Sequence, residues 1–178
     1  MHNTEDKEWW VREYGEEYEK YFVENIAARL KIPIRINPEK ATNIYAPDLI
    51  KTGRNRSLVD LKCQSTPFFK AEILYGFDPS FTVTFNKKDY DRYKGLYPDI
   101  SVIFWVHWST HRWLDRYGKI YTVQPVSGVW WCKLEDITGQ IENEAPLHEY
   151  GRRKHDVYGN AKYSYLLDLR DMYFYGNA

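Results

Sequence analysis

The sequence predicts an α/β domain, with α+β as the alternative, in which a central β-sheet is flanked by helices. Three observations predict it: a helix-like stretch comes first, two short strand-like stretches around a Gly-containing turn follow, and strands and helices then alternate. The 178 residues and the 43% hydrophobic content are enough for one ordinary core. No repeat, low-complexity tract or linker divides the chain. We therefore expect one domain over residues 1–178.

The first element is an amphipathic helix over about residues 8–30. Val11, Tyr14, Tyr18, Phe22 and Ile26 recur at helical spacing and form an apolar stripe. We place the centre of this stripe near Tyr18 and Phe22. The stripe predicts that the helix packs on the sheet through this face.

One glutamate of this helix is a candidate for a buried role. With residues wound at about 100° each, Glu19 falls on the border of the apolar stripe, and the other four glutamates lie further round. A carboxylate at the margin of a packed face can reach the sheet beneath it. The alternative is that all five glutamates are surface charges that form pairs such as Glu16 with Lys20, four residues apart.

The second feature is a hairpin formed by residues 46–51 and 56–63. If the hairpin is symmetric about Arg54, Asp48 lies directly opposite Asp60. Directly opposed side chains have Cβ atoms about 4.5–5.5 Å apart, and like charges there are destabilising unless something lies between them. A divalent cation would resolve this conflict.

The residues around Asp60 suit a particular chemistry. Asp60 and Lys62 are two residues apart, so on a strand they point to the same face. Carboxylate oxygens hold Mg²⁺ and leave positions for water and a phosphate oxygen, while an ammonium stabilises charge on the phosphoryl group or orients the nucleophile. The alternative is that Asp-x-Lys occurs by chance and that Pro47 and Asp48 simply open a strand or cap a turn.

The following elements alternate. Residues 80–86 alternate in polarity like a strand, residues 87–98 indicate a short helix, and residues 99–108 are nearly all apolar, as in a strand covered on both faces. Beyond about residue 109 we expect two further strands and one short helix.

The order of these motifs resembles the PD-(D/E)XK nuclease superfamily. "GEEYE" (15–19) lies on the first helix, "PDL" follows at 47–49, and "DLK" at 60–62, so the resemblance covers about residues 15–64. It implies an αβββαβ core with a mixed four-stranded sheet. It also implies that Glu19, Asp48 and Asp60 bind Mg²⁺, with Mn²⁺ able to substitute, and that Lys62 assists the attacking water. Gln64 resembles the extra polar residue that some members carry.

The resemblance implies a metal-dependent nuclease that cuts DNA, as an endonuclease of the restriction, repair, junction-resolving or mobile-element type. One such site cuts one strand, so double-strand cutting would favour a homodimer. The chain has 25 basic and 25 acidic residues, so its net charge does not attract DNA, and any phosphate contacts must come from local groups of basic residues. Candidate DNA contacts are Lys51, Arg54, Arg56, Arg152, Arg153 and Lys154.

Other function classes are weighed against this one. A non-catalytic nucleic-acid-binding or assembly module on the same sheet is the main alternative, and RNA is an alternative substrate because the metal site does not read the sugar. No membrane-spanning run or secretory signal is present, so we expect a cytoplasmic protein without a membrane partner. Cys63 and Cys132 are too few for a disulfide framework or a thiolate metal site, and we give them no role.

Overall fold

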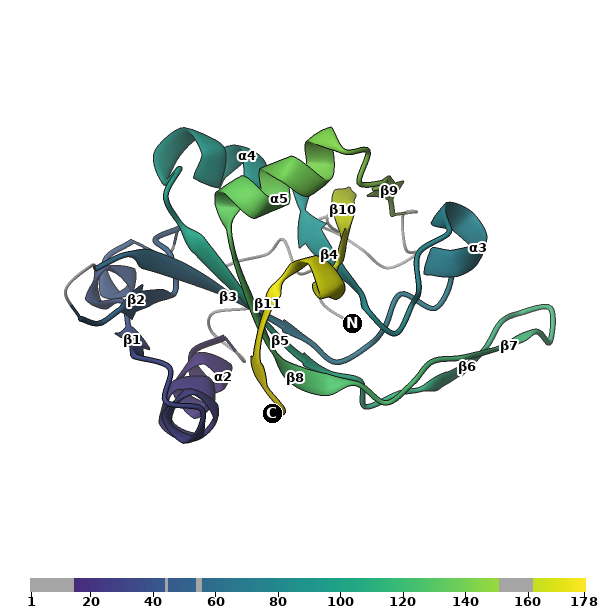
Figure 1. The fold of residues 1–178 in the computed structure, drawn as a ribbon, viewed down its shortest axis with the longest axis horizontal. Helices are drawn as coiled ribbons and strands as arrows, with labels where there is room; N and C mark the ends of the chain where they lie inside the picture. The colour runs from purple at the N-terminus through teal and green to yellow at the C-terminus, as the bar shows by residue number, and fades with distance from the viewer. Residues whose placement is uncertain (1–14, 44, 54–55, 151–161) are drawn as a thin grey trace.

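The computed structural model describes residues 15–43, 45–53, 56–150 and 162–178. They form one α/β domain around a mixed six-stranded sheet with the order β1-β2-β3-β5-β8-β11, which confirms the predicted fold class. Helix α2 covers one face of this sheet, and α4 and α5 cover the other (Figure 1). A three-stranded sheet, β4-β10-β9, and a two-stranded ribbon, β6-β7, are added to this core.

The N-terminal half contains the predicted helix, hairpin (β2 and β3), strand at 80–86 (β4), helix (α4) and strand (β5) in that order. The expected four-stranded sheet is wrong, because β4 belongs to the separate three-stranded sheet and the central sheet has six strands, among them β1, which the sequence did not indicate. The other additions between these elements are η3 and α3. The bounds are α2 (Glu16–Tyr21), η2 (Phe22–Ala27, a π-helical continuation of α2), β1 (Ile34–Ile36), η3 (Pro38–Ala41), β2 (Leu49–Lys51), β3 (Leu58–Gln64), α3 (Ala71–Tyr75), β4 (Thr82–Asn86), α4 (Lys87–Leu96) and β5 (Ser101–His107).

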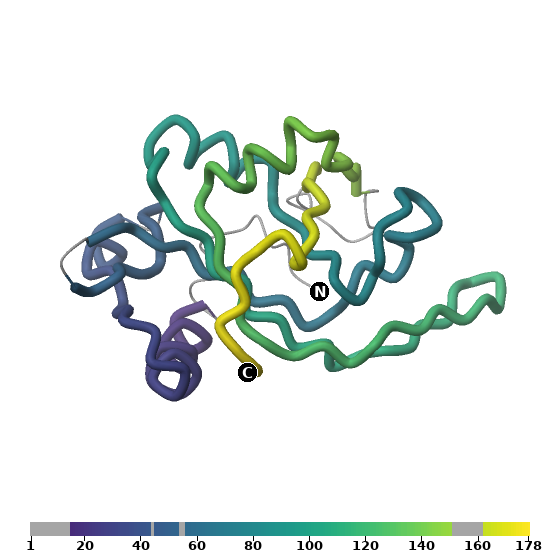
Figure 2. The backbone as a smooth tube through the Cα atoms, viewed as in Figure 1, coloured from purple at the N-terminus to yellow at the C-terminus, as the bar shows by residue number. Residues whose placement is uncertain are grey.

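The C-terminal part holds more strands than expected. Instead of two further strands, its described residues contribute six. Several of these are only three residues long, and two of them, β6 and β7, lack a buried face that would give them an alternating pattern. The C-terminal segment returns to the central sheet, where β11 pairs with β8 (Figure 2). The bounds are β6 (Arg112–Leu114), β7 (Ile120–Thr122), β8 (Ser127–Lys133), α5 (Leu134–Glu142), β9 (Leu147–Glu149), β10 (Tyr163–Asp168), η4 (Leu169–Asp171) and β11 (Tyr173–Gly176).

The hairpin of β2 and β3 has the predicted register. Leu49 pairs with Val59 and Ile50 with Leu58 in antiparallel alignment, the pairing that a turn centred on Arg54 requires. Strand β3 then runs parallel to β5, and the connection between them carries α4. Since side chains alternate along a strand, this register decides which face each residue of β3 reaches.

The two faces of the sheet carry separate apolar clusters. Leu49, Val59 and Leu61 pack with Phe22 and Ile26 on the α2 side. Val102 and Phe104 of β5 pack with Tyr93 and Ile137 on the side of α4 and α5. Asp60 lies in β3 between Val59 and Leu61, so its side chain points to the α4 side.

The apolar stripe of the first helix is centred differently from the prediction. Tyr18 is 46% exposed, whereas Glu19 is only 8% exposed. The reason is that Val23, Leu30 and Ala27 also pack on the sheet, which moves the centre of the buried stripe round the helix from Tyr18 to Glu19. The carboxylate is therefore inside the packed face rather than on its border.

In the described part of the chain, no helix has the length and apolar character needed to cross a membrane.

Two glycines allow a test of the packing around β8. A Cβ atom at Gly128 would lie 2.7 Å from a ring atom of Phe174 and 2.9 Å from ring atoms of Trp130, whereas one at Gly139 in α5 would meet nothing within 4 Å. We expect Gly128→Ala to lower the free energy of unfolding by about 1–3 kcal/mol through overpacking. Gly139→Ala should raise it by about 0.5–1 kcal/mol, because alanine favours a helix interior. Urea unfolding measures both, and equal effects of the two changes would contradict the packing described for β8.

Candidate functional site

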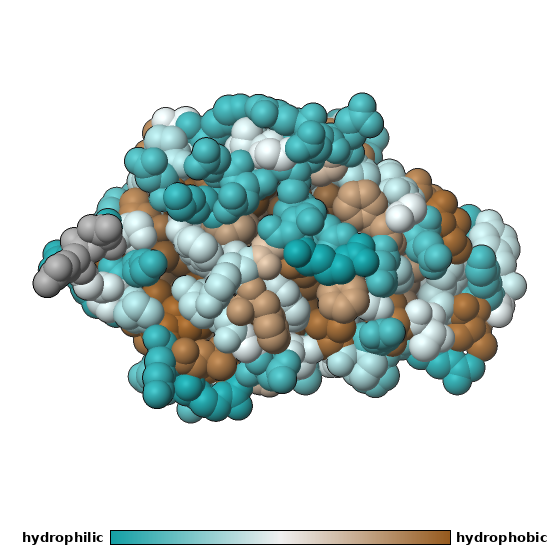
Figure 3. Space-filling view, viewed as in Figure 1, coloured by the Kyte–Doolittle hydropathy of each residue, from teal (hydrophilic) through white to brown (hydrophobic). Residues whose placement is uncertain are grey.

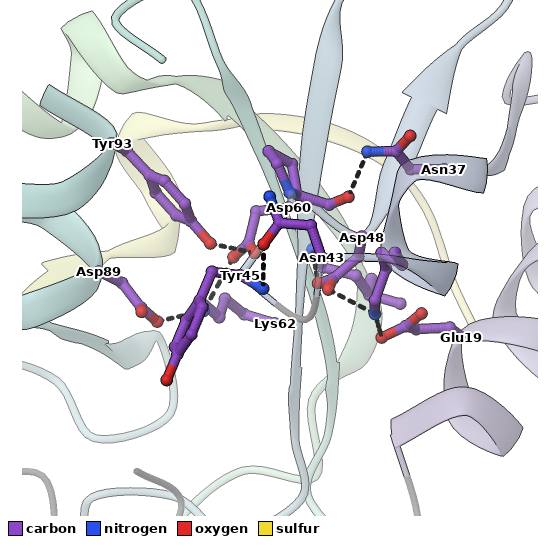
Figure 4. Close-up of polar contacts among 12 residues, drawn as sticks. Glu19, Asn37, Asn43, Tyr45, Asp48, Asp60, Lys62, Asp89 and Tyr93 are labelled. Carbon is purple, nitrogen blue, oxygen red and sulfur yellow. Dashed lines mark hydrogen bonds and ion pairs between the residues drawn. The ribbon is translucent and has the colours of Figure 1, made fainter. Parts of the chain in front are cut away.

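Two clusters of charged side chains lie where β2 and β3 meet the helices (Figure 4). The Glu19 cluster consists of Glu19, Lys40 and Asp48. The Asp60 cluster consists of Asp60, Lys62, Asp89, Arg92 and Tyr93.

In the Glu19 cluster one ammonium lies between two carboxylates. Lys40 Nζ forms an ion pair with Glu19 and a second one with Asp48 Oδ1 at 2.9 Å. The three side chains come from α2, η3 and the residue before β2, and all are largely buried. Lys40 therefore occupies the place between these carboxylates that a metal cation would take.

A buried asparagine holds Lys40 in this place. Asn37 accepts a hydrogen bond from Glu39 N at 3.1 Å and so caps η3, the helix that carries Lys40. Its side-chain amide donates to Pro47 O at 2.8 Å, and its backbone N–H donates to Asp48 O at 2.9 Å. The short helix η3 is thereby fixed to the segment that enters β2.

Asp48 connects the Glu19 cluster to β3. Its Oδ2 accepts a hydrogen bond from Leu61 N at 3.0 Å, and its Oδ1 faces Lys40. Leu61 lies between Asp60 and Lys62, so the bond joins Asp48 to the segment that carries the second cluster. The two clusters form one continuous site.

The Asp60 cluster is completed by α4. Lys62 Nζ lies 2.8 Å from Asp60 Oδ2 and donates to Asp89 Oδ2 at 2.5 Å. The Tyr93 hydroxyl donates to Asp60 Oδ1, and Arg92 donates to Asp89 Oδ1 at 2.6 Å. The ammonium of Lys62 is thus held between two carboxylates.

The pKa values of three groups in the site are shifted from their usual values. Burial, with a smaller contribution from Asp48, raises the pKa of Glu19 to about 8 even beside Lys40. Burial and the nearby Asp48 and Asp89 raise the pKa of Asp60 to about 6 against the opposing effect of Lys62. Burial alone would lower the pKa of Lys62, but Asp60 and Asp89 outweigh it and hold that pKa well above its usual range. Lys62 therefore stays protonated at neutral pH.

The chemistry of the carboxylates fits a hard divalent cation. Asp60 Oδ2 is buried and, although it lies near Lys62 Nζ, makes no hydrogen bond. Burial is the largest cause of the raised pKa values of Glu19 and Asp60, and a bound cation would favour the ionised form of both groups. Across the described ranges, no three Asp, Glu, His or Cys side chains are already grouped to hold a metal ion. Glu19 and Asp48 instead face Lys40, so a metal would have to displace that ammonium.

The four principal residues predicted from the sequence lie together: Glu19, Asp48, Asp60 and Lys62 all belong to this site (Figure 4). Gln64 is engaged elsewhere. Its amide donates to Thr84 O at 2.7 Å and accepts from Thr84 N at 3.2 Å, so it ties β3 to β4.

The predicted DNA contacts are partly described. Lys51 Nζ lies 5.7 Å from the centre of the Trp131 ring, and Arg56 is exposed at the start of the segment that leads into β3. The other four candidates, Arg54, Arg152, Arg153 and Lys154, lie outside the described residues.

Sequence reasoning missed Lys40 and the three residues from α4. The α4 residues could have been found from the sequence, because Asp89, Arg92 and Tyr93 recur at the spacing that places side chains on one face of a helix. Lys40 had none, since nothing in "NPEKA" indicates that η3 folds back over the helix that carries Glu19.

Comparisons of the chain with protein-family models, with curated proteins and with solved structures gave no match. The interpretation of the site therefore rests on the contacts and charges of its own residues.

The pKa of Glu19 predicts how stability depends on pH. A pKa of about 8, raised from 4.5, means that the folded protein keeps a proton that the unfolded chain releases. The stabilising contribution is complete at low pH and is lost as the pH rises through about 8. Asp60, with a pKa of about 6, is already ionised at pH 7. When the pH rises from 7 to 9, the free energy of unfolding should therefore fall by about 1 kcal/mol more in the parent than in Glu19→Gln.

Urea unfolding in EDTA at pH 7 and 9 measures this difference. Glu16→Gln, on the exposed side of α2, is the matched control and should keep the pH dependence of the parent. If Glu19→Gln also keeps it, Glu19 is ionised throughout this range and the proton assignment is wrong.

Proposed function

We propose that this protein is a divalent-metal-dependent nuclease that hydrolyses DNA phosphodiester bonds as an endonuclease. The observation that carries the proposal is the register of β2 and β3, because it brings the carboxylates of Asp48 and Asp60 to one place beside Lys62. Glu19, on α2, is connected to Asp48 by Lys40, whose ammonium forms an ion pair with both carboxylates. Carboxylates and an ammonium gathered in this way suit phosphoryl chemistry.

The residues have separate roles in this proposal. Asp48, Asp60 and Glu19 would hold Mg²⁺ or Mn²⁺, which when bound supplies Lewis-acid stabilisation of the charge on the phosphoryl oxygens. Lys62, fixed between Asp60 and Asp89, donates hydrogen bonds to the attacking water or to a phosphoryl oxygen. Because Lys62 stays protonated, it orients the attacking water or stabilises the charge on the phosphoryl oxygen, and it does not remove the proton from the water.

The substrate in this proposal is DNA. Arg56 and Lys51, with Arg54 and the segment of Arg152, Arg153 and Lys154, are the proposed phosphate contacts. Since one site cuts one strand, cutting both strands would use a homodimer.

A second candidate function is favoured by Lys40. An ammonium fixed between Glu19 and Asp48 pairs with both carboxylates without a metal. This arrangement suits a nucleic-acid-binding or assembly module that keeps a nuclease-like sheet and has no activity. Whether a metal can displace Lys40 distinguishes the two functions.

The first test of the proposal is cleavage. Plasmid, linear, branched and single-stranded DNA, and RNA, are incubated with Mg²⁺, Mn²⁺ or EDTA. We expect metal-dependent cutting of DNA, reduced by at least about 100-fold in Asp60→Asn and in Lys62→Met, because each change removes a charge from the reacting centre. Asp91→Asn removes an exposed carboxylate of α4 that forms an ion pair with Lys87, and it is the control. Equal rates in the parent and both variants would contradict the proposed site.

The second test is metal affinity. We expect Lys40→Met to bind Mn²⁺ about ten-fold more tightly than the parent, a gain of about 1.4 kcal/mol, because the cation that competes for Glu19 and Asp48 is removed. Isothermal titration calorimetry measures the affinity, and Lys20→Met, on the exposed side of α2, is the control. Unchanged or weaker binding in Lys40→Met would favour the non-catalytic module.

A further inference from the structure

The ribbon of β6 and β7 extends away from the body of the protein (Figure 1). We call residues 111–122 the arm. Its strands pair Arg112 with Thr122, Trp113 with Tyr121 and Leu114 with Ile120. In the part of the chain that the structure describes, β6 and β7 form a sheet of their own and pair with no other strand.

The arm has a fixed root and a defined tip. At the root, Trp108 is buried, its indole donates to Ser80 O at 2.9 Å, and Gln124 N donates to Ser80 Oγ at 3.0 Å. At the tip, Asp115 Oδ1 accepts hydrogen bonds from Tyr117 N at 2.8 Å and Lys119 N at 2.9 Å. The arm therefore holds a defined direction relative to β5 and β8.

The arm carries a local excess of positive charge on a chain with a net charge of zero. Arg112, Arg116 and Lys119 are exposed and form no ion pair with any acidic residue that the structure describes. The carboxylate of Asp115 is the only negative group of the arm, and the amides of its own turn already bind it. The three cations are thus available to an anionic partner.

Aromatic and aliphatic side chains lie among these charges. The Arg116 guanidinium lies 4.7 Å from the centre of the Tyr117 ring, and Lys119 Nζ lies 5.1 Å from that of Tyr121. Tyr117 is 76% exposed and Leu114 is 61% exposed. Figure 3 shows brown hydrophobic residues beside teal polar ones at the right-hand end of the molecule, where Figure 1 places the arm.

The arm is connected to the candidate site through β5. Asp60 pairs with Val102 of β5, and the chain of β5 continues from there to Arg112 at the root of the arm.

From these features we infer that the arm is a DNA-binding element that enters a groove of duplex DNA, with Arg112, Arg116 and Lys119 against the phosphates. A two-stranded ribbon fits the major groove, and neutralising phosphates provides affinity without reading sequence. The inference rests on the proposed function for its choice of DNA as the partner, and it names the part of the protein that positions the duplex.

The test measures binding in EDTA, where no metal-dependent cutting occurs. Fluorescence anisotropy with a labelled duplex of about 30 base pairs compares the parent with Arg116→Gln/Lys119→Gln. We expect about ten-fold weaker binding at 0.1 M salt, and a slope of log affinity against log salt that is smaller by about two. Lys94→Gln/Lys133→Gln removes the same charge from α4 and the end of β8 and should stay within two-fold of the parent.

The outcomes separate this inference from the proposed nuclease activity. If the arm variant binds with the affinity and salt slope of the parent, or if the parent does not bind duplex DNA, the inference is overturned, whatever the cleavage result. If the arm variant is weakened in binding while no DNA is cut under any condition, the arm assignment holds and the nuclease proposal fails. A change of oligomeric state in sedimentation, with unchanged DNA affinity, would assign the arm to contact between copies of the chain and overturn the inference.

Discussion

The site depends on one constraint, the pairing of β2 with β3. This register sends Leu49, Val59 and Leu61 to the α2 side of the sheet, and it brings Asp48, just before β2, close to the segment of Asp60. A slip of one residue would place Asp60 in the apolar cluster and Val59 among the charges. The hydrophobic packing on one face and the Asp60 cluster on the other therefore specify the same register.

The charges of the site balance only in part. Asp60 and Asp89 are matched by Lys62 and Arg92, whereas Glu19 and Asp48 share the single cation Lys40. Burial, with a smaller contribution from Asp48, raises the pKa of Glu19, and a proton on Glu19 removes the surplus negative charge beside α2. A divalent cation could replace both the proton on Glu19 and the ammonium of Lys40. The proposed nuclease requires this replacement, whereas the proposed non-catalytic module keeps Lys40 in place.

The central sheet also connects the site to the arm. Strand β5 lies beside β3 at the site, and its chain continues into β6, while β7 returns into β8. The direction of the arm comes from the buried root at Trp108, from the sheet, and from the contacts of Trp113 with Phe69 and Lys70. The strands of the site and the strands that lead into the arm are therefore neighbours in one sheet.

The sequence by itself determined the elements whose patterns are local. The helical stripe with Phe22 and Ile26, the apolar run of β5, and the hairpin with Asp48 opposite Asp60 all follow from spacing, because side-chain periodicity and turn length act within a few residues. The class of the fold followed from their order.

Only the tertiary structure decided the partners of those residues. Lys40 reaches Glu19 across 21 positions and Asp89 reaches Lys62 across 27, and no local pattern encodes such a contact. The short strands after β5 were also undercounted, because three-residue strands are defined by the neighbours they pair with and not by their own sequence. The carboxylates of the site were readable from the chain, and the cations that neutralise them came from packing.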